Sequence, residues 1–450
     1  MPRTLQALIA VAALSLAACE RPADSPPELT TGVWQAVLEL PGGQAPFGLE
    51  FGREGDRYLA TLINGHERVS VPDVRFDPTD GTLGLGFPAF GNRIDARLVD
   101  GQLTGHLSKL QRTEVQKIPF SATPGSVADT HAAPPQVDLS GRWAVTFTED
   151  DGKTYPAVGE FAQRGDRLFG TFLTPTADHR YLGGHVRGRE MMLATFDGAH
   201  AFLFRAEVQP NESLTGEFWS GLRSHETFVA TRNEDAALPD ANTLTFINEG
   251  YERFEFSFED LDGNTVSLDD ERFAGKVVVV TLAGSWCPNC HDEAAFMAPL
   301  YQKYRDQGFE IVALMFEHVG DDVEAARRQV AAFRDKFDIE YVTLLAGTSD
   351  KDQASEMLPS LNAVMAFPTT IFIDATGAVR RIHTGFTGPG TGEHYTELTN
   401  EFTDYVETLL AEAAAPSTPE PADETVTDSP ADGDSAGDPA ADPQPAAETN

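Results

Sequence analysis

Residues 277–293 read VVVVTLAGSWCPNCHDE and decide the fold of the C-terminal part of the chain. The apolar run at residues 277–282 predicts a strand that is buried on both faces, as in the middle of an α/β sheet. A proline directly after the first cysteine suits the first turn of a helix, which we expect over residues 288–307. Cys287 and Cys290 are therefore expected where a buried strand gives way to a helix.

The position of this cysteine pair favours redox chemistry. A thiolate at a helix N-terminus faces unpaired N–H groups and the positive end of the helix dipole, which stabilise it as a nucleophile. The two-residue spacer puts Cys290 close enough to attack a mixed disulfide formed at Cys287. A structural bridge over so short a loop would stabilise little, and zinc would need more ligands than His291 supplies. We therefore expect no metal or other cofactor, and a redox-active disulfide Cys287–Cys290.

The sequence around the dithiol predicts one α/β domain over residues 243–412. We expect strands at residues 309–316 and 341–345, a helix at 323–337 between them, and then a hairpin around Thr376 and Gly377. A last helix should carry one apolar face, made of Tyr395, Leu398, Phe402, Val406 and Leu409. This order of elements predicts a mixed sheet with helices on both sides.

An internal repeat precedes this domain. GDRYLATL at residues 55–62 recurs as GDRLFGTF at residues 165–172, and further anchors recur in the same order. Short alternating runs broken by Gly and Asp are typical of strands and turns. We therefore predict a multidomain chain in which two tandem all-β modules, small barrels or sandwiches, occupy residues 29–122 and 137–233. The segment at residues 123–136 is expected to link them.

The first nineteen residues are interpreted as an export signal. Arg3 gives a basic start, residues 5–16 are mostly apolar, and the sequence LAAC that ends in Cys19 resembles the bacterial lipoprotein box. That box is cleaved before its cysteine, so residues 1–18 would be removed and Cys19 would be lipidated. An ordinary secretory signal also fits. Both readings place the mature chain outside the cytoplasm, and Glu20, which is not the aspartate of inner-membrane retention, favours the outer membrane.

Charge restricts the choice of partners. The chain has 33 basic and 70 acidic residues, a net charge of −37, which repels phosphate backbones and excludes nucleic acid as a partner. Residues 413–450 are rich in Pro, Ala, Asp and Glu, so we expect a disordered acidic tail. The histidines of the second β module, His179, His185 and His200, are interpreted as structural or surface residues.

Two motifs together point to a family. WCPNC at residues 286–290, followed far downstream by FPTT at residues 367–370, resembles the thioredoxin-like fold of TlpA/ResA-type extracytoplasmic thiol–disulfide oxidoreductases. The resemblance covers about residues 254–410. It implies that Cys287 is the attacking thiol and Cys290 the resolving thiol.

The same resemblance assigns further residues to the site. Trp286 belongs to the motif itself, and Pro368 would be the cis-proline beside the dithiol. The buried acid of thioredoxin falls here on Thr281, which cannot titrate. Glu293 matches the glutamate that TlpA/ResA-type proteins hold near the dithiol, where it would take the proton from Cys290. The alternative is a glutamate that is stabilised only by the helix dipole.

The predicted function is an extracytoplasmic thiol–disulfide oxidoreductase that acts as a reductase. Its partners would be the thiols and disulfides of envelope proteins, an upstream electron donor in the membrane, and the membrane itself through the lipid anchor. The β modules would set the distance between that anchor and the dithiol.

Three other functions remain open from the sequence. In the first, the β modules are the functional part, a binding or scaffold unit with an accessory thioredoxin domain. A peroxidase of the peroxiredoxin type is disfavoured because Val280 and Gly284 stand where that class has proline and threonine. Copper delivery is disfavoured by the two-residue spacer, although His383 offers a distal histidine.

Overall fold

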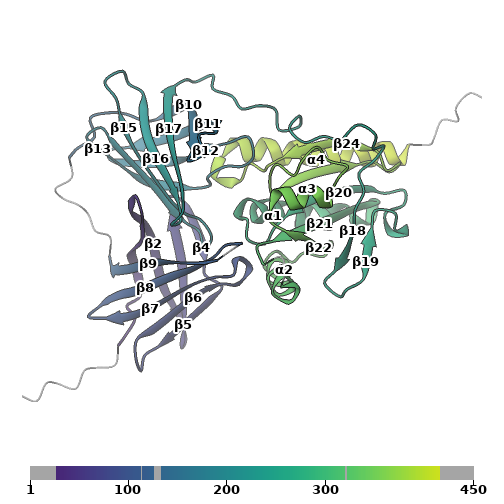
Figure 1. The fold of residues 1–450 in the computed structure, drawn as a ribbon. Helices are drawn as coiled ribbons and strands as arrows, with labels where there is room; N and C mark the ends of the chain where they lie inside the picture. The colour runs from purple at the N-terminus through teal and green to yellow at the C-terminus, as the bar shows by residue number, and fades with distance from the viewer. Residues whose placement is uncertain (1–26, 113, 126–132, 320–321, 416–450) are drawn as a thin grey trace, which may run out of the picture. The chain divides into compact units, whose positions relative to one another are not determined.

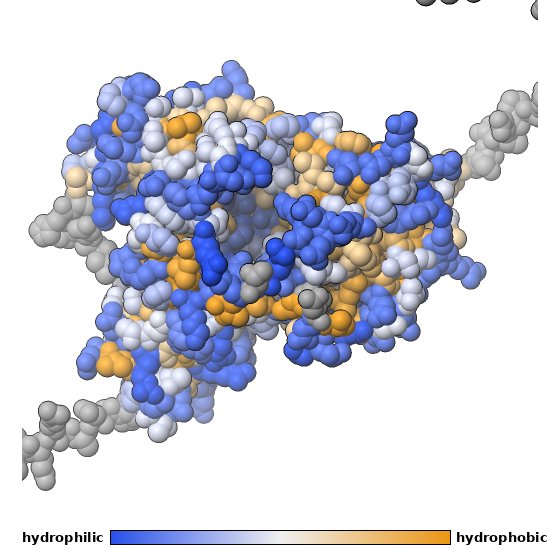
Figure 2. All heavy atoms as spheres, in the orientation of Figure 1, coloured by the Kyte–Doolittle hydropathy of each residue, from blue (hydrophilic) through white to orange (hydrophobic). Residues whose placement is uncertain are grey.

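The computed structural model describes residues 27–112, 114–125, 133–319 and 322–415. The expected signal segment, Cys19 and most of the acidic tail lie outside these residues. Within the described part of the chain, no helix combines the length and the apolar character needed to span a membrane. Figure 2 shows that hydrophilic residues cover most of the face in view, in keeping with the high charge of the chain.

The first β module is one antiparallel sheet of nine strands (Figure 1), in the order β4-β3-β2-β1-β9-β8-β7-β6-β5. Its first and last strands, β1 and β9, pair with each other in the middle of the sheet. Strands β4 and β5 form its two edges, so this module is an open sheet. The strands are β1 (Gly32–Leu40), β2 (Gly43–Glu54), β3 (Arg57–Asn64), β4 (Glu67–Ser70), β5 (Asp73–Asp77), β6 (Thr82–Phe87), β7 (Asn92–Val99), β8 (Gln102–Leu110) and β9 (Val115–Pro124), with a short turn η1 (Pro88–Phe90) after β6.

The second β module is a closed barrel of strands β10 to β17. It closes because β10 pairs with both β11 and β17. Alternate residues point inward, and large aromatic side chains fill the interior, among them Phe147, Phe172, Phe204 and Phe228. The strands are β10 (Gly141–Glu149), β11 (Thr154–Arg164), β12 (Arg167–Leu173), β13 (Leu182–Arg187), β14 (Glu190–Phe196), β15 (Ala201–Val208), β16 (Leu214–Ser220) and β17 (Ser224–Arg232).

Equivalent residues of the two copies make the same contacts and adopt the same backbone conformations. Trp34 and Trp143 are both buried, and each indole N–H donates to the carbonyl four residues earlier, at 2.9 and 3.0 Å. Gly55 and Gly165 have φ of 59° and 65° at matching hairpin turns, a conformation that favours glycine. The prediction of two all-β modules is therefore confirmed. The strand β9 continues to Pro124, so the segment expected as a linker begins two residues later than predicted.

The C-terminal domain is the predicted mixed α/β sheet. Its seven strands run in the order β19-β18-β22-β21-β20-β23-β24. β20 is parallel to β21 and antiparallel to β23. The strands are β18 (Ser257–Asp260), β19 (Thr265–Ser267), β20 (Val277–Ala283), β21 (Phe309–Glu317), β22 (Val342–Thr348), β23 (Thr369–Ile373) and β24 (Val379–Thr384). The helices are α1 (Pro288–Tyr304), α2 (Val323–Phe337), α3 (Lys351–Met357) and α4 (Glu393–Ala414), with short turns η2 (Glu271–Phe273), η3 (Arg305–Gln307) and η4 (Pro389–Thr391).

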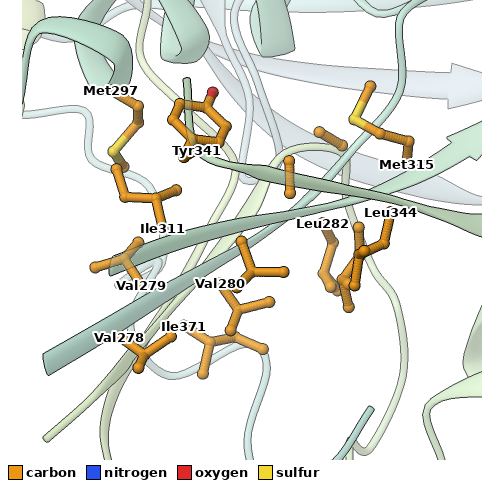
Figure 3. Packing of buried hydrophobic residues seen from close by; sticks show 14 of the residues in the cluster. Val278, Val279, Val280, Leu282, Met297, Ile311, Met315, Tyr341, Leu344 and Ile371 are labelled. Atoms are coloured by element: carbon orange, nitrogen blue, oxygen red, sulfur yellow. The ribbon is translucent and has the colours of Figure 1, made fainter. Parts of the chain in front are cut away.

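The central strand β20 organises the core of this domain. All of its residues are buried, as the apolar run predicts. Figure 3 shows its valines among side chains of other strands of the sheet and of helix α1, including Ile311, Met315, Leu344, Ile371 and Met297. The chain leaves this buried strand through a short loop and enters α1, so the loop that leads to Cys287 starts from a strand fixed by its packing.

Candidate active site

Cys287 lies at the start of helix α1 and interacts with both sides of the site. It is the N-cap residue, and its Sγ accepts a hydrogen bond from the Cys290 backbone N–H (3.3 Å). The same thiol donates to the Phe367 carbonyl (3.3 Å), directly before Pro368. Both cysteines are free thiols, with Cys287 5% and Cys290 1% exposed. The bond between Phe367 and Pro368 is cis, the isomer that the family resemblance implies.

Trp286 forms a wall of the site. Its indole N–H donates to the Phe316 carbonyl (2.8 Å), which fixes the ring at the end of β21. The ring stacks on His318, with centroids 4.3 Å apart, and meets Phe367 edge-on at 5.8 Å. The structure therefore brings Trp286, Cys287, Cys290 and the segment before Pro368 together.

Glu293 is a buried carboxyl group beneath the dithiol. It is 1% exposed, and it accepts hydrogen bonds from the hydroxyls of Thr281 and of Thr370, the latter at 2.6 Å. Burial raises the pKa of Glu293 to about 7, against the effect of these two hydrogen bonds. Thr281 cannot titrate, but it holds the carboxyl group that does.

The thiol of Cys290 is held in its protonated form. Burial raises the pKa of Cys290 well above its usual value, and the neighbouring Cys287 and Glu293 raise it further. A thiol of this kind needs a base before it can attack a disulfide. Glu293 is the buried carboxyl group whose charge acts on it, and its pKa of about 7 suits proton transfer near neutral pH.

Glu317 is a second buried carboxyl group near the dithiol, which the sequence analysis missed. It ends β21, is 1% exposed, and accepts from the backbone N–H (2.9 Å) and hydroxyl (2.6 Å) of Ser285. Burial raises the pKa of Glu317 to about 7. Its signal in the sequence was a single acid at the end of an apolar strand. The contact fixes the loop that leads to Cys287.

Arg180, from the barrel, connects all three modules next to the start of α1. Its guanidinium donates to the Pro288 carbonyl (3.1 Å) and to the Asp292 carboxylate. It also donates to Glu67 of the first module (2.6 Å) and lies 3.1 Å from Asp197 of the barrel. Burial disfavours the charge of Arg180, but the three carboxylates outweigh burial and raise its pKa. Arg180 itself is in the left-handed region, with φ of 55°.

A second barrel residue binds the dithiol motif itself. The side-chain amide of Asn289, a spacer residue of the motif, donates to the Asp178 carboxylate (3.2 Å). Asp178 also accepts from the Gly388 backbone N–H (2.7 Å), in the glycine-rich loop before α4. One barrel carboxylate therefore joins the redox motif to that loop.

The first β module packs against this same N-terminal end of α1. Phe90 stacks on His291, with ring centroids 4.2 Å apart and nearly parallel planes. The Lys336 ammonium lies 5.2 Å from the centre of the Phe90 ring and 2.8 Å from His291 Nδ1. Burial lowers the pKa of His291 well below its usual value, so its neutral ring accepts from Lys336 and donates through Nε2 to the Ser285 carbonyl (2.7 Å). Both β modules thus contact the dithiol region directly, which the sequence analysis did not predict.

The histidines noted in the sequence have ordinary structural partners. His179 lies among the aromatic rings of the barrel, and burial lowers its pKa to about 4. His200 pairs with Asp197 (3.1 Å), and His383 contacts Asn242 (3.1 Å). Across residues 27–415, apart from the positions left undescribed, no group of three or more His, Cys, Asp or Glu side chains is arranged to hold a metal ion.

Comparison with known proteins agrees with this geometry. The Redoxin family model matches residues 235–398. The thioredoxin-like protein YneN of Bacillus subtilis (strain 168) is 32% identical over 142 residues, which are 31% of this chain and 73% of that protein. The thiol-disulfide oxidoreductase ResA of the same organism is 30% identical over 139 residues, 31% of this chain and 69% of that protein.

A solved structure gives a further match. The thiol:disulfide interchange protein of the thioredoxin family from Chlorobium tepidum TLS is 20% identical, covers 36% of this chain and 98% of its own, and has a TM-score of 0.28. On the sequence matches, the chain belongs to the thioredoxin-like Redoxin family and is related to ResA-type proteins. It is accordingly a thiol–disulfide oxidoreductase, which confirms the resemblance found in the sequence.

Proposed function

We propose that this chain is an extracytoplasmic reductase that exchanges disulfides with envelope proteins through Cys287 and Cys290. Cys19 would carry the lipid anchor, with the outer membrane favoured, and an electron donor in the membrane would restore the dithiol. The export signal in the first nineteen residues supports this location. The buried dithiol at the start of α1 supports the chemistry.

The proposed reaction has two exchange steps. The Cys287 thiolate attacks one sulfur of the substrate disulfide, forms a mixed disulfide and releases the other substrate sulfur as a thiol. Glu293 then takes the proton of Cys290, and the Cys290 thiolate attacks Cys287. This step releases the second substrate thiol and leaves the Cys287–Cys290 disulfide. The substrate gains two electrons and two protons, and the enzyme dithiol supplies both.

The observation that carries this proposal is that the charge of the buried Glu293 carboxyl group acts on the Cys290 thiol. Burial raises the pKa of the Cys290 thiol, so this thiol needs a base. The buried carboxyl group of Glu293 has a pKa of about 7. Trp286 and the segment before Pro368 enclose the attacking sulfur, and the Phe367 carbonyl already accepts from it (3.3 Å). A substrate backbone at this edge would lie next to Cys287.

Single-turnover reduction of insulin by the reduced full chain tests the roles of the two cysteines. Cys287→Ser should abolish thiol release. Cys290→Ser should release one thiol and leave a mixed disulfide that is visible by mass spectrometry. Release of both thiols by Cys290→Ser, or reaction of Cys287→Ser at the wild-type rate, would contradict the assignment.

The direction of exchange is tested separately, by the reduction potential of the pair in glutathione buffers. A reductase should have a potential near that of thioredoxin, about −270 mV. A value near −120 mV, typical of a strong periplasmic oxidant, would reverse the proposed direction.

A further inference from the structure

A cavity of about 310 Å³ lies directly over the attacking cysteine, and all three modules form its walls. This volume is at the lower end of the range for small-molecule sites, about 300–1,000 Å³. The lining includes Cys287 itself. The lining also includes Phe90 and Lys109 of the first module, Phe202 of the barrel, and Trp286 and Phe367 of the α/β domain.

The chemistry of this lining differs from that of the chain as a whole. The chain has 70 acidic and 33 basic residues, yet the described lining of the cavity contains a lysine and no carboxylate. Aromatic side chains from the three modules, among them Phe202 and Trp286, give it flat apolar walls. Such a site disfavours cations and suits a ligand that combines apolar atoms with negative charge.

Lys109 supplies the positive charge. It lies near the end of β8, and its ammonium donates to a neutral acceptor, the Ala199 carbonyl (2.7 Å), so this contact leaves its charge uncompensated. Burial lowers the pKa of Lys109 to about 8. This value is still above 7, so most of the ammonium stays protonated at neutral pH. The carboxylate that attracts it, Asp197, already pairs with Arg180 and His200, each at 3.1 Å.

We propose that this cavity binds a low-molecular-weight disulfide that carries a carboxylate, with Lys109 as the group that binds the carboxylate. The inference rests on the exchange chemistry proposed above and adds a second substrate class to it. Cys287 attacks one sulfur of the bound disulfide and the first thiol leaves. Cys290 then attacks Cys287 and releases the second thiol, so that two electrons and two protons pass from the enzyme dithiol to the substrate.

Three probes of similar size and different charge test this proposal. 3,3′-Dithiodipropionate is a dianion, 2-hydroxyethyl disulfide is neutral, and cystamine is a dication. The reduced full chain is mixed with each probe under single-turnover conditions, and its remaining thiols are alkylated and counted by mass spectrometry. Each rate is divided by the rate of dithiothreitol with the same probe, which removes the intrinsic reactivity of the disulfide. Insulin serves as the protein disulfide.

Variants at Lys109 separate charge from structure. Lys109→Met removes the ammonium and keeps the length of the side chain, and Lys109→Arg keeps the charge. Lys117→Met is the matched control, because Lys117 is exposed on β9 of the same module and does not line the cavity. We expect Lys109→Met to lower the normalised rate with the dianion about tenfold, and the rate with the neutral probe less than twofold. Lys109→Arg and Lys117→Met should stay close to wild type.

The outcomes distinguish this inference from the proposed function. A wild-type preference for the dianion over the dication that Lys109→Met abolishes would support the cavity as a substrate site. Equal normalised rates with the three probes would overturn it, as would an equal loss with the neutral and anionic probes in Lys109→Met. Reaction with insulin but with none of the small probes would also overturn it, while the proposed function would stand. Reaction with no disulfide at all would overturn both.

Discussion

Replacing Glu293 with Gln should stabilise the protein at alkaline pH. The carboxyl group has an ordinary pKa of 4.5 and a folded-state pKa of about 7, because burial disfavours its charge. The folded state therefore keeps this proton where the unfolded state has lost it, and stability falls as the pH rises from about 4.5 through 7. At 1.36 kcal/mol for each pH unit, this cost reaches about 3 kcal/mol above pH 7. Glutamine is neutral at every pH and does not incur this cost.

The comparison of two pH values isolates this effect. Lost or altered hydrogen bonds to Thr281 and Thr370 should change the stability of Glu293→Gln about equally at pH 5 and pH 8. The advantage of the variant over wild type should nevertheless grow by about 2–3 kcal/mol between these pH values. Urea unfolding of both proteins at both pH values measures it, as a midpoint difference of roughly 1 M. Glu317→Gln should show a gain of the same sign, because burial raises the pKa of Glu317 to about 7 as well.

The rate at which Cys290 resolves the mixed disulfide distinguishes the role of Glu293 from that of Glu317. Glu293→Gln should slow the resolution of the mixed disulfide by Cys290 about a hundredfold at pH 7, the lower end of the usual range for loss of a general base. Glu317→Gln should leave that step near wild type, because Glu317 hydrogen-bonds Ser285 and not the groups around Cys290. If Glu293→Gln and wild type kept a constant stability difference from pH 5 to pH 8, the buried carboxyl group would not titrate as argued.

Three further changes test other parts of the structure. Arg180→Met leaves three carboxylates without their shared cation and should lower the thermal midpoint by an amount that corresponds to about 3–5 kcal/mol; an unchanged midpoint would show that the ion pairs contribute nothing. Phe90→Ala removes the ring stacked on His291 and should lower the free energy of unfolding by about 3 kcal/mol. It should also speed proteolysis between the first module and the α/β domain. An unchanged cleavage pattern would count against this docking contact. Cys19→Ser should abolish metabolic labelling with palmitate and release a soluble protein whose rate with small disulfides is unchanged; a variant that stays in the membrane fraction would refute the lipoprotein assignment.

The α/β domain could be predicted from its sequence because local signals and the overall fold agree there. The apolar run at residues 277–282 has one stable environment, a strand covered on both faces, and β20 is buried throughout. The β modules were predicted less completely. Alternation of apolar and polar residues shows which face of a strand is buried, but it does not show whether the first and last strands close a barrel. The pairing of β10 with β17 closes the second copy, and the corresponding pairing of β1 with β9 leaves the first copy open at β4 and β5.

In the site, too, the residues that are close in sequence could be predicted, and those brought together by docking of the modules could not. Cys287, Cys290, Glu293 and Trp286 lie within eight consecutive residues, so their proximity follows from the helix start and the first two turns of α1. Arg180 could not be assigned in this way, because its contact with Asp292 joins residues 112 positions apart and depends on how the barrel docks. Lys109 and the cavity wall depend on the same docking. No local pattern in the sequence carries that information.

The hydrogen bond between Asn289 and Asp178 has an evolutionary consequence. A spacer residue of the redox motif that is held by a different module is not free to change alone, because its loss removes one hydrogen bond from the buried Asp178 carboxylate. These two positions, 111 residues apart, should therefore vary together in relatives that keep both modules. Relatives without the barrel should tolerate many residues at the position of Asn289. Acquisition of the barrel would thus have narrowed the choice of spacer residues, and natural selection on the dithiol would act on a chain segment that contains no cysteine.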